Sequence, residues 1–216
     1  MSDPAETSPT RKRVRLAPAA RKRLILDAAL AEFAANGFGA TSTEKIAQRA
    51  GLSQAGLYAH FDSKDAILAA LLEETLVPKW DLLMREDERV LGTAIDAWID
   101  LSYTRIADPV FQSVFRILIA ESNRIRHLVG DWRRDVLAPQ RAEQQRIADA
   151  LISKGNVQRC TLTEHNELTL SPLVHALMVH LLNGTGNGPN AEVIAIREAH
   201  RKLLKEQLAV DRGAPS

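Results

Sequence analysis

The chain has 216 residues, 45% of them hydrophobic and 25% charged, a balance typical of a globular protein with one or two domains. Its one cysteine, Cys160, excludes an intramolecular disulfide and a cysteine metal cluster. No apolar run reaches the ~18 residues of a membrane span, and the polar N-terminus has no signal-peptide segment, so we expect a cytoplasmic protein with no membrane partner.

Positive charge is concentrated at the start of the chain. Residues 1–64 hold 10 Lys and Arg against 6 Asp and Glu, whereas residues 65–216 hold 18 against 21. The first part therefore carries a net charge of +4 and the remainder −3, which indicates that the N-terminal part meets a polyanion. Residues 1–20 are rich in Pro, Ser, Thr and Ala, with cations at Arg11, Lys12, Arg13 and Arg15. We expect a disordered basic arm that either contacts DNA or only aids solubility.

Four short helices are predicted between residues 21 and 78. The first begins at about Arg21 and ends at Asn36-Gly37, where a left-handed C-cap is tolerated. The second begins at Thr41-Ser42-Thr43, where Thr41 and Glu44 fit a capping box, and stops at Gly51. Ser53 caps a third helix that reaches about Phe61, and Ser63 caps a fourth that extends to Pro78.

The remainder is also predicted to be helical. The expected helices cover Val90–Ala107, Val110–Glu121, Ile125–Ser153 with a kink at Pro139, Leu168–Leu182 and Ala191–Val210. Gln158–His165 is expected to be a polar connection and Asn183–Asn190 a loop. The predicted fold is all-α, with a basic arm at 1–20, a three-helix DNA-binding domain at 21–68, a larger ligand-binding and dimerisation domain at 69–210, and a disordered tail at 211–216.

The stretch from Thr41 to Leu68 carries the functional signal. Two short helices joined by a turn at Gly51 define a helix-turn-helix, with Ile46, Leu52 and Leu57 as its small core. The outer face of the third helix then shows Gln54, Ala55, Gly56, Tyr58 and His60. Gln54 suits bidentate contact with adenine in the major groove, and Tyr58 and His60 suit phosphate oxygens. Lys64, at the next helix start, suits another phosphate.

This stretch resembles the TetR family of repressors over about residues 20–70. The residues that carry the resemblance are Phe33, Gly37, Phe38, Thr41-Ser42-Thr43, Ile46-Ala47, Ala50-Gly51-Leu52-Ser53, Leu57-Tyr58, His60-Phe61 and Ser63-Lys64-Asp65. The resemblance implies a helical dimer whose second domain binds a small-molecule ligand. It also implies that the family's DNA-contact positions are occupied by Thr43, Gln54, Ala55, Gly56, Tyr58, His60 and Lys64.

The last two predicted helices each present a broad apolar face. We expect these faces to pair with their symmetry mates in a four-helix bundle, although packing within one chain is the alternative. The residues assigned to this homodimer interface are Leu173, Leu177, Leu181, Ile196, Leu203 and Leu204. The middle helices should surround a cavity for an apolar or amphipathic effector, with candidate lining residues Trp98, Tyr103, Phe111, Phe115, Arg116, Glu121 and Trp132.

The predicted function is a sequence-specific transcription regulator, a repressor released from its double-stranded operator DNA by the effector. The alternative is a ligand-independent DNA-binding regulator whose second domain binds a protein partner. No metal site, cofactor or catalytic group is predicted, because the sequence has no phosphate-binding loop, nucleophile elbow or HExxH motif. His127 and Asp131 have the spacing of a metal pair, but an ordinary surface pair on one helix is the favoured interpretation.

Overall fold

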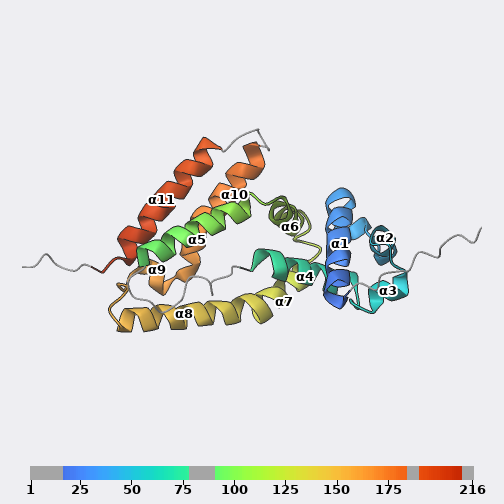
Figure 1. The fold of residues 1–216 in the computed structure, drawn as a ribbon, viewed down its shortest axis with the longest axis horizontal. Coiled ribbons are helices and arrows are strands. Elements are labelled where there is room, and N and C mark those ends of the chain that lie inside the picture. The colour runs from blue at the N-terminus through green and yellow to red at the C-terminus, as the bar shows by residue number, and fades with distance from the viewer. Residues whose placement is uncertain (1–16, 78–90, 184–189, 211–216) are drawn as a thin grey trace, which may run out of the picture.

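The computed structural model describes residues 17–77, 91–183 and 190–210, and every regular element in these ranges is a helix. Figure 1 shows an elongated molecule with α1 to α4 at one end and α5, α10 and α11 at the other. The helices are α1 (Pro18–Ala40), α2 (Thr43–Arg49), α3 (Gln54–Tyr58), α4 (Lys64–Leu76), α5 (Leu91–Ile106), α6 (Pro109–Ala120), α7 (Arg126–Trp132), η2 (Arg133–Leu137), α8 (Ala138–Ser153), α9 (Thr161–Glu164), η3 (Asn166–Leu170), α10 (Ser171–Asn183) and α11 (Ala191–Leu208). None of the described helices is both long and apolar enough to cross a bilayer.

The predicted elements are confirmed in number and order up to α6. Pro18 to Ala20 belong to α1, so this part of the predicted disordered arm is wrong; residues 1–16 and 211–216 lie outside the described residues. Gly37 has φ +76 and breaks the regular helix where the sequence predicted its end. The predicted boundary between residues 68 and 69 falls inside α4, which is continuous.

The predicted capping box at Thr41 is wrong. Thr41 is buried, and its hydroxyl donates to the carbonyl oxygens of Gly37 at 2.8 Å and Glu32 at 3.2 Å. The residue therefore satisfies acceptors near the end of α1, where helix carbonyls lack partners. The N-cap of α2 is the next residue, Ser42, whose hydroxyl accepts from the Lys45 N–H at 3.3 Å.

The long helix predicted over Ile125–Ser153 is divided into three segments. A π-helical turn, η2, separates α7 from α8, and the Ala138 N–H bonds five residues back to the Arg133 carbonyl. Pro139, in the first turn of α8, has no N–H with which to continue the α pattern, and a wide turn before it accommodates this loss. The predicted connection Gln158–His165 contains the short helix α9, which the sequence analysis missed.

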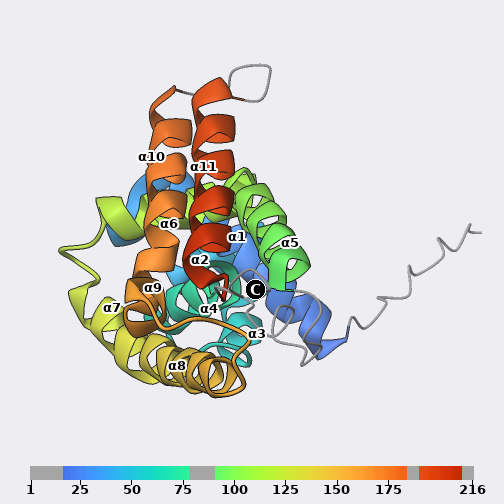
Figure 2. The same cartoon turned by 90° about the vertical axis from the view of Figure 1, so that its left-hand side faces the viewer.

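The side chains of the molecule pack into two hydrophobic cores. The first joins α1, α2, α3 and α4 with α6 and α7, whose contributions are Val114, Ile117, Ile125 and Leu128. The second joins α5, α10 and α11, which lie together in Figures 1 and 2. The helix-turn-helix is therefore fused to part of the following domain through a shared core.

The second core contains several of the residues predicted for the dimer interface. Leu173, Leu177 and Leu204 are buried within the single chain, and Leu181 and Ile196 pack against them. Of the six predicted interface residues, Leu203 is exposed. Packing within one chain thus accounts for Leu173, Leu177 and Leu204, whereas the interface role of the partly buried Leu181 and Ile196 and the exposed Leu203 stays a prediction.

A different apolar stripe remains exposed on α10. It consists of Val174 (49% exposed), Met178 (41%) and Leu182 (79%), spaced four residues apart and therefore on one side of the helix. Leu203 on the adjacent α11 is 40% exposed. We call these four residues the α10–α11 surface.

Candidate nucleic-acid interface

The turn between α2 and α3 depends on Gly51. This residue has φ +68, a left-handed conformation that glycine adopts without steric cost. The turn is closed by hydrogen bonds from the Gly51 N–H to the Gln48 carbonyl and from the Leu52 N–H to the Ala47 carbonyl. Ser53 then caps α3 by accepting from the Gly56 N–H at 3.1 Å, as its sequence position predicted.

Buried residues between the two helices fix the orientation of α3. Ile46 and Leu57 are fully buried, Ala47 is nearly so, and Leu52 packs against the same core. Because one side of α3 packs against this core, the other side faces outward. Figure 1 places α2 and α3 on the outer side of α1, away from the second core.

The outward side of α3 carries the residues predicted to meet DNA. Gln54, Ala55 and Tyr58 are exposed, whereas Gly56 and His60 are half-buried. The Tyr58 hydroxyl lies 3.1 Å from the hydroxyl of Thr43 at the start of α2. This hydrogen bond places the phenol and threonine oxygens together on the surface, and the hydroxyl that accepts in it keeps its own hydrogen for an outside acceptor.

Lys64 is directed into the protein. Its ammonium donates to the Phe38 carbonyl at 2.7 Å and the Thr41 carbonyl at 2.8 Å, and lies 4.4 Å from the centre of the Phe38 ring. Burial lowers the pKa of Lys64. The side chain thus holds the connection between α1 and α2, and its predicted phosphate contact remains a prediction.

A second polar contact ties α1 to α2. Glu32 is buried in the first core, accepts from the Arg49 Nε at 2.6 Å and also accepts from the Asn36 amide. The hydrogen bond from Arg49 lowers the pKa of the Glu32 carboxyl. The sequence analysis did not identify this pair; the available signal was a carboxylate beside Phe33 in the apolar stripe of α1.

Known proteins share this N-terminal domain. The family model for bacterial regulatory proteins of the tetR family matches residues 25–71, which run from α1 through most of α4. This stretch of the chain therefore matches the N-terminal domain of the TetR family. This confirms the resemblance that was based on the residues around Gly51 and Tyr58.

Two HTH-type transcriptional regulators that resemble this chain differ in how much of it they cover. The regulator RutR of Escherichia coli K12 is 45% identical over 67 residues, 31% of this chain and 31% of RutR, so this match spans about a third of either protein. The repressor KstR2 of Rhodococcus jostii is 26% identical over 137 residues, 62% of this chain and 65% of KstR2.

Solved structures extend the similarity in fold to the second domain. A TetR-family regulator from Pseudomonas syringae pv. tomato is 20% identical, with a TM-score of 0.67, over 88% of this chain and 96% of that one. The SmeT–triclosan complex is 17% identical, with a TM-score of 0.64, over 91% and 100%. The predicted all-helical fold, with a small N-terminal and a larger C-terminal part, is thus confirmed.

Two of the predicted ligand-lining residues lie in the second core. Trp98 and Tyr103 of α5 are buried, and both rings contact the buried imidazole of His200 on α11. The Tyr103 hydroxyl lies 3.3 Å from His200 Nδ1. Burial lowers the pKa of His200 to about 4, so the imidazole is neutral near pH 7, and burial raises the pKa of Tyr103 to about 12.

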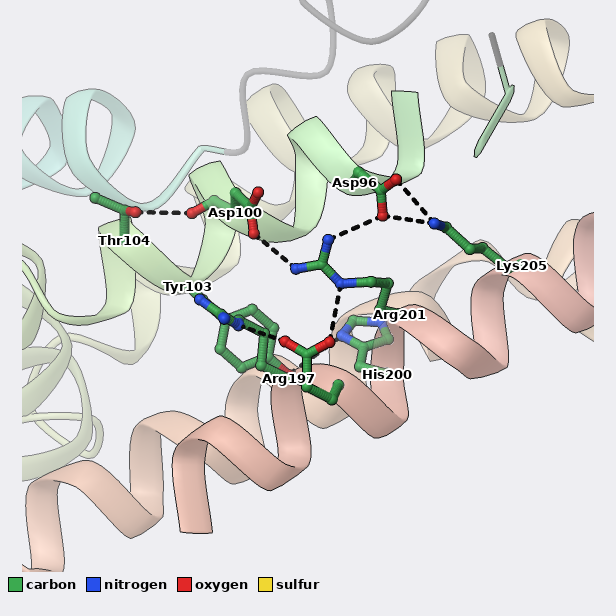
Figure 3. Close-up of polar contacts among 9 residues, drawn as sticks. Asp96, Asp100, Tyr103, Thr104, Arg197, His200, Arg201 and Lys205 are labelled. Carbon is green, nitrogen blue, oxygen red and sulfur yellow. Dashed lines mark hydrogen bonds and ion pairs between the residues drawn. The ribbon is translucent and has the colours of Figure 1, made fainter. Parts of the chain in front are cut away.

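Ion pairs between α5 and α11 lie beside Tyr103 and His200 (Figure 3). Arg201 binds Asp96 at 2.9 Å and Asp100 at 2.7 Å, and Lys205 binds Asp96 at 2.7 Å. Hydrogen bonds from the two cations lower the pKa of Asp96. The sequence analysis missed His200 as a partner of the aromatic residues, although it lies on the apolar side of the last predicted helix.

The other predicted lining residues do not gather around Trp98. Phe111 and Phe115 pack against the second core, but Trp132 packs against the first core and Arg116 is exposed. Glu121 accepts from the Phe38 N–H at 3.0 Å, so it joins the end of α6 to the end of α1. The structure therefore does not bring Arg116, Glu121 and Trp132 together with Trp98 and Tyr103, and the ligand-lining role of the seven residues stays a prediction.

The predicted surface pair of His127 and Asp131 is also wrong. His127 Nε2 lies 3.0 Å from the Asp65 carboxylate at the start of α4, and Asp131 pairs with Arg134 at 2.9 Å. Both ends of α4 are thus held from the second domain, because Arg105 of α5 donates to the Thr75 and Val77 carbonyls.

Proposed function

We propose that this chain is a sequence-specific DNA-binding transcription regulator that places α3 in the major groove of its operator. The observation that carries the proposal is the exposed face of Gln54, Ala55 and Tyr58 on a helix fixed by the buried Leu57. A side-chain amide at the start of such a helix can bond both edges of an adenine. The small Ala55 and Gly56 leave room for the backbone of α3 to approach the bases.

Phosphate contacts would fix the register of α3. The paired hydroxyls of Thr43 and Tyr58 face solvent at the junction of α2 and α3, and either can donate to a phosphate oxygen. Such contacts add affinity at every sequence, whereas Gln54 supplies discrimination. The proposed role involves no catalysis.

We propose that the regulator acts as a homodimer through the α10–α11 surface. Three apolar side chains on one side of α10 form a stripe that a second copy covers when the same stripes meet around a two-fold axis. Two recognition helices then read half-sites ~34–36 Å apart, one turn of the double helix. The operator is expected to be palindromic.

We further propose that a small apolar or amphipathic effector releases a repressing dimer from DNA. The SmeT–triclosan complex supports this proposal through its similar fold. The shared first core supplies a route, because a shift of α6 or α7 changes the packing around α4 and hence the position of α3. An effector acts only if its affinity differs between the two arrangements.

The test is selection of DNA by the purified full-length protein from a random duplex pool at moderate ionic strength. We expect a palindromic site, and we expect the Gln54→Ala, Tyr58→Ala double variant to lose preference for it. A matched variant, Lys154→Ala, changes an exposed residue at the end of α8 and should select the same site. Failure of the wild-type protein to prefer any duplex over random competitor would contradict the proposal.

A further inference from the structure

An open cavity of about 670 Å³ lies where the two parts of the molecule meet. Its walls come from the start of α1, the second half of α4, the end of α5 and the start of α6. A volume of this size is typical of sites for small molecules, ~300–1,000 Å³. The cavity touches both the DNA-binding domain and the helices that follow it.

Arg105 at the end of α5 is one of the charged residues that line this cavity. Its Nη2 donates to the Thr75 carbonyl at 2.6 Å and the Val77 carbonyl at 3.2 Å. A guanidinium has five N–H donors, so Nε and Nη1 retain three, and none has an acceptor among the described residues. Burial lowers the pKa of Arg105, which shows that the charge is partly removed from water.

Two of the three carboxylates that line the cavity, Glu74 and Asp108, have partners other than Arg105, and the third, Glu73, forms no ion pair with Arg105. Glu74 pairs with Lys22 at 3.4 Å and Arg23 at 4.0 Å, and Asp108 caps α6 by accepting from the Val110 N–H at 2.7 Å. Within the described ranges, Arg105 forms no ion pair. Asp108 acts on Arg105 only through its nearby charge, without an ion pair. A half-buried arginine with no ion-paired carboxylate is a favourable partner for a carboxylate from outside, because the two groups can form parallel charge-assisted hydrogen bonds.

Apolar side chains lie beside the guanidinium. The Phe111 ring centre is 5.7 Å from the Arg105 carbon Cζ, and Ala70, Val77 and Val110 also border the cavity. We propose that the cavity binds a small monocarboxylate with an apolar body, its carboxylate on Arg105 and its body against Phe111 and Val110. Of the seven residues predicted to line a ligand site, Phe111 borders this cavity.

Such a ligand would contact the DNA-binding domain directly. Arg105 holds the last carbonyls of α4, and the opposite wall is formed by α1 and α4 themselves. A bound carboxylate shares the guanidinium with those carbonyls and bridges the two parts. The role of this ligand as an effector rests on the proposed function. The binding of the ligand to the cavity does not depend on that function.

Calorimetric titration of the full-length protein tests the site without DNA. The probes are octanoate, 4-phenylbutyrate and indole-3-acetate, each compared with its neutral primary amide. We expect at least one carboxylate to bind about tenfold or more tightly than its amide, the effect of a hydrogen-bonded charge. We expect Arg105→Gln to remove this preference and Val110→Trp to abolish binding by filling the cavity.

Thermal unfolding checks that each variant is folded. Arg105→Gln removes the guanidinium and Val110→Trp fills the cavity, so the result for either folded variant alone tests the binding site. The site is overturned if no carboxylate exceeds its amide, or if a folded variant binds as the wild type does. A bound carboxylate should change affinity for the selected duplex by roughly 5- to 150-fold. If a bound carboxylate leaves the affinity for the duplex unchanged, the regulatory role of the site is overturned. Binding of the duplex in the absence of any carboxylate tests the proposed DNA-binding function separately.

Discussion

Gln54 and Tyr58 occupy the same surface of α3 but should contribute to DNA binding differently. We expect Gln54→Ala to lose about 1–3 kcal/mol of discrimination at one base pair of each half-site. Tyr58→Phe keeps the packing but removes the hydroxyl that meets Thr43. It should weaken binding to all duplexes alike, by about 1.5–3 kcal/mol for each hydrogen bond to a charged phosphate that it removes. Fluorescence anisotropy on the selected site and on single-base variants measures both, and equal losses at every sequence for Gln54→Ala would contradict base contact.

His200 should make the stability of the protein depend on pH. Its pKa is about 4 in the folded chain, against ~6.5 in an unfolded one. Between these values the unfolded chain binds a proton that the folded chain does not, so the free energy of unfolding falls as pH decreases. The full loss is about 3 kcal/mol, of which roughly half occurs between pH 6.5 and 5.

Urea unfolding across pH 5 to 6.5 measures this loss. The lowered pKa values of Glu32 and Asp96 affect stability at more acidic pH, mostly outside this window. The control is His200→Leu, which cannot titrate and should show a flatter dependence. Equal slopes for the two proteins would exclude His200 as the cause.

Residue positions in the helix-turn-helix were predicted well because their causes are local. Ser53, Gly51 and Leu57 each have a role set by residues within about one helical turn, and the structure confirms all three. Thr41 was predicted to cap the second helix with Glu44, and Lys64 was predicted to contact a phosphate. In the structure, Thr41 bonds to the Glu32 carbonyl and Lys64 to the Phe38 carbonyl, and both contacts depend on how α1 ends. A sequence pattern gives no direct sign of such contacts.

At the scale of elements, α10 shows what hydrophobic periodicity can and cannot predict. The pattern correctly gave an apolar helix, but it could not say which apolar side faces its own chain. Leu173 and Leu177 are in the second core, whereas Val174 and Met178, one residue further along, are exposed. The two sides differ by about 100° of rotation, and only the packing of α5 and α11 decides between them.

The α10–α11 surface predicts a clear contrast between neighbouring residues. We expect Met178→Glu with Leu182→Glu to give a folded monomer, because a charge on an exposed stripe affects association and not the chain's own core. Leu177→Ala should instead lower the free energy of unfolding by about 2–5 kcal/mol, since that side chain is buried. Sedimentation velocity and urea unfolding separate the two effects. A doubly charged variant that stays dimeric would rule out this surface.

The junction of α6 with α1 predicts a second effect at this scale. Glu121 accepts from the Phe38 N–H, and Gly37 leaves it room, because a Cβ there would lie 2.8 Å from Glu121 Oε1. Glu121→Ala should cost roughly 1–3 kcal/mol of stability by leaving a partly buried N–H without its acceptor. Glu121→Gln keeps the acceptor and loses only the pairing with Arg124, so it should cost less. Equal costs in urea unfolding would assign the stability to the ion pair instead.

At the scale of the whole molecule, the two cores do not follow the predicted domains. The first core takes Val114, Ile117, Ile125 and Leu128 from the part assigned to effector binding. The sequence could not show this, because an apolar stripe on α6 is equally suited to either neighbour. Because Leu57 of α3 lies in the same core as these side chains, a shift of α6 or α7 changes the packing of the core that orients the DNA-binding face.

The asymmetry of charge predicts how DNA binding depends on salt. Each phosphate neutralised by a cation contributes about −0.9 to the slope of log affinity against log salt concentration. If the basic arm binds DNA, removing residues 1–16 should make the slope less negative by about 0.9 for each phosphate that the arm neutralises in each subunit. The full-length chain with Arg11, Lys12, Arg13 and Arg15 changed to Gln should reproduce that slope, since the charge and not the length of the arm is responsible. A truncated protein with the original slope would show that the arm only aids solubility, and that α3 and its surroundings supply every phosphate contact.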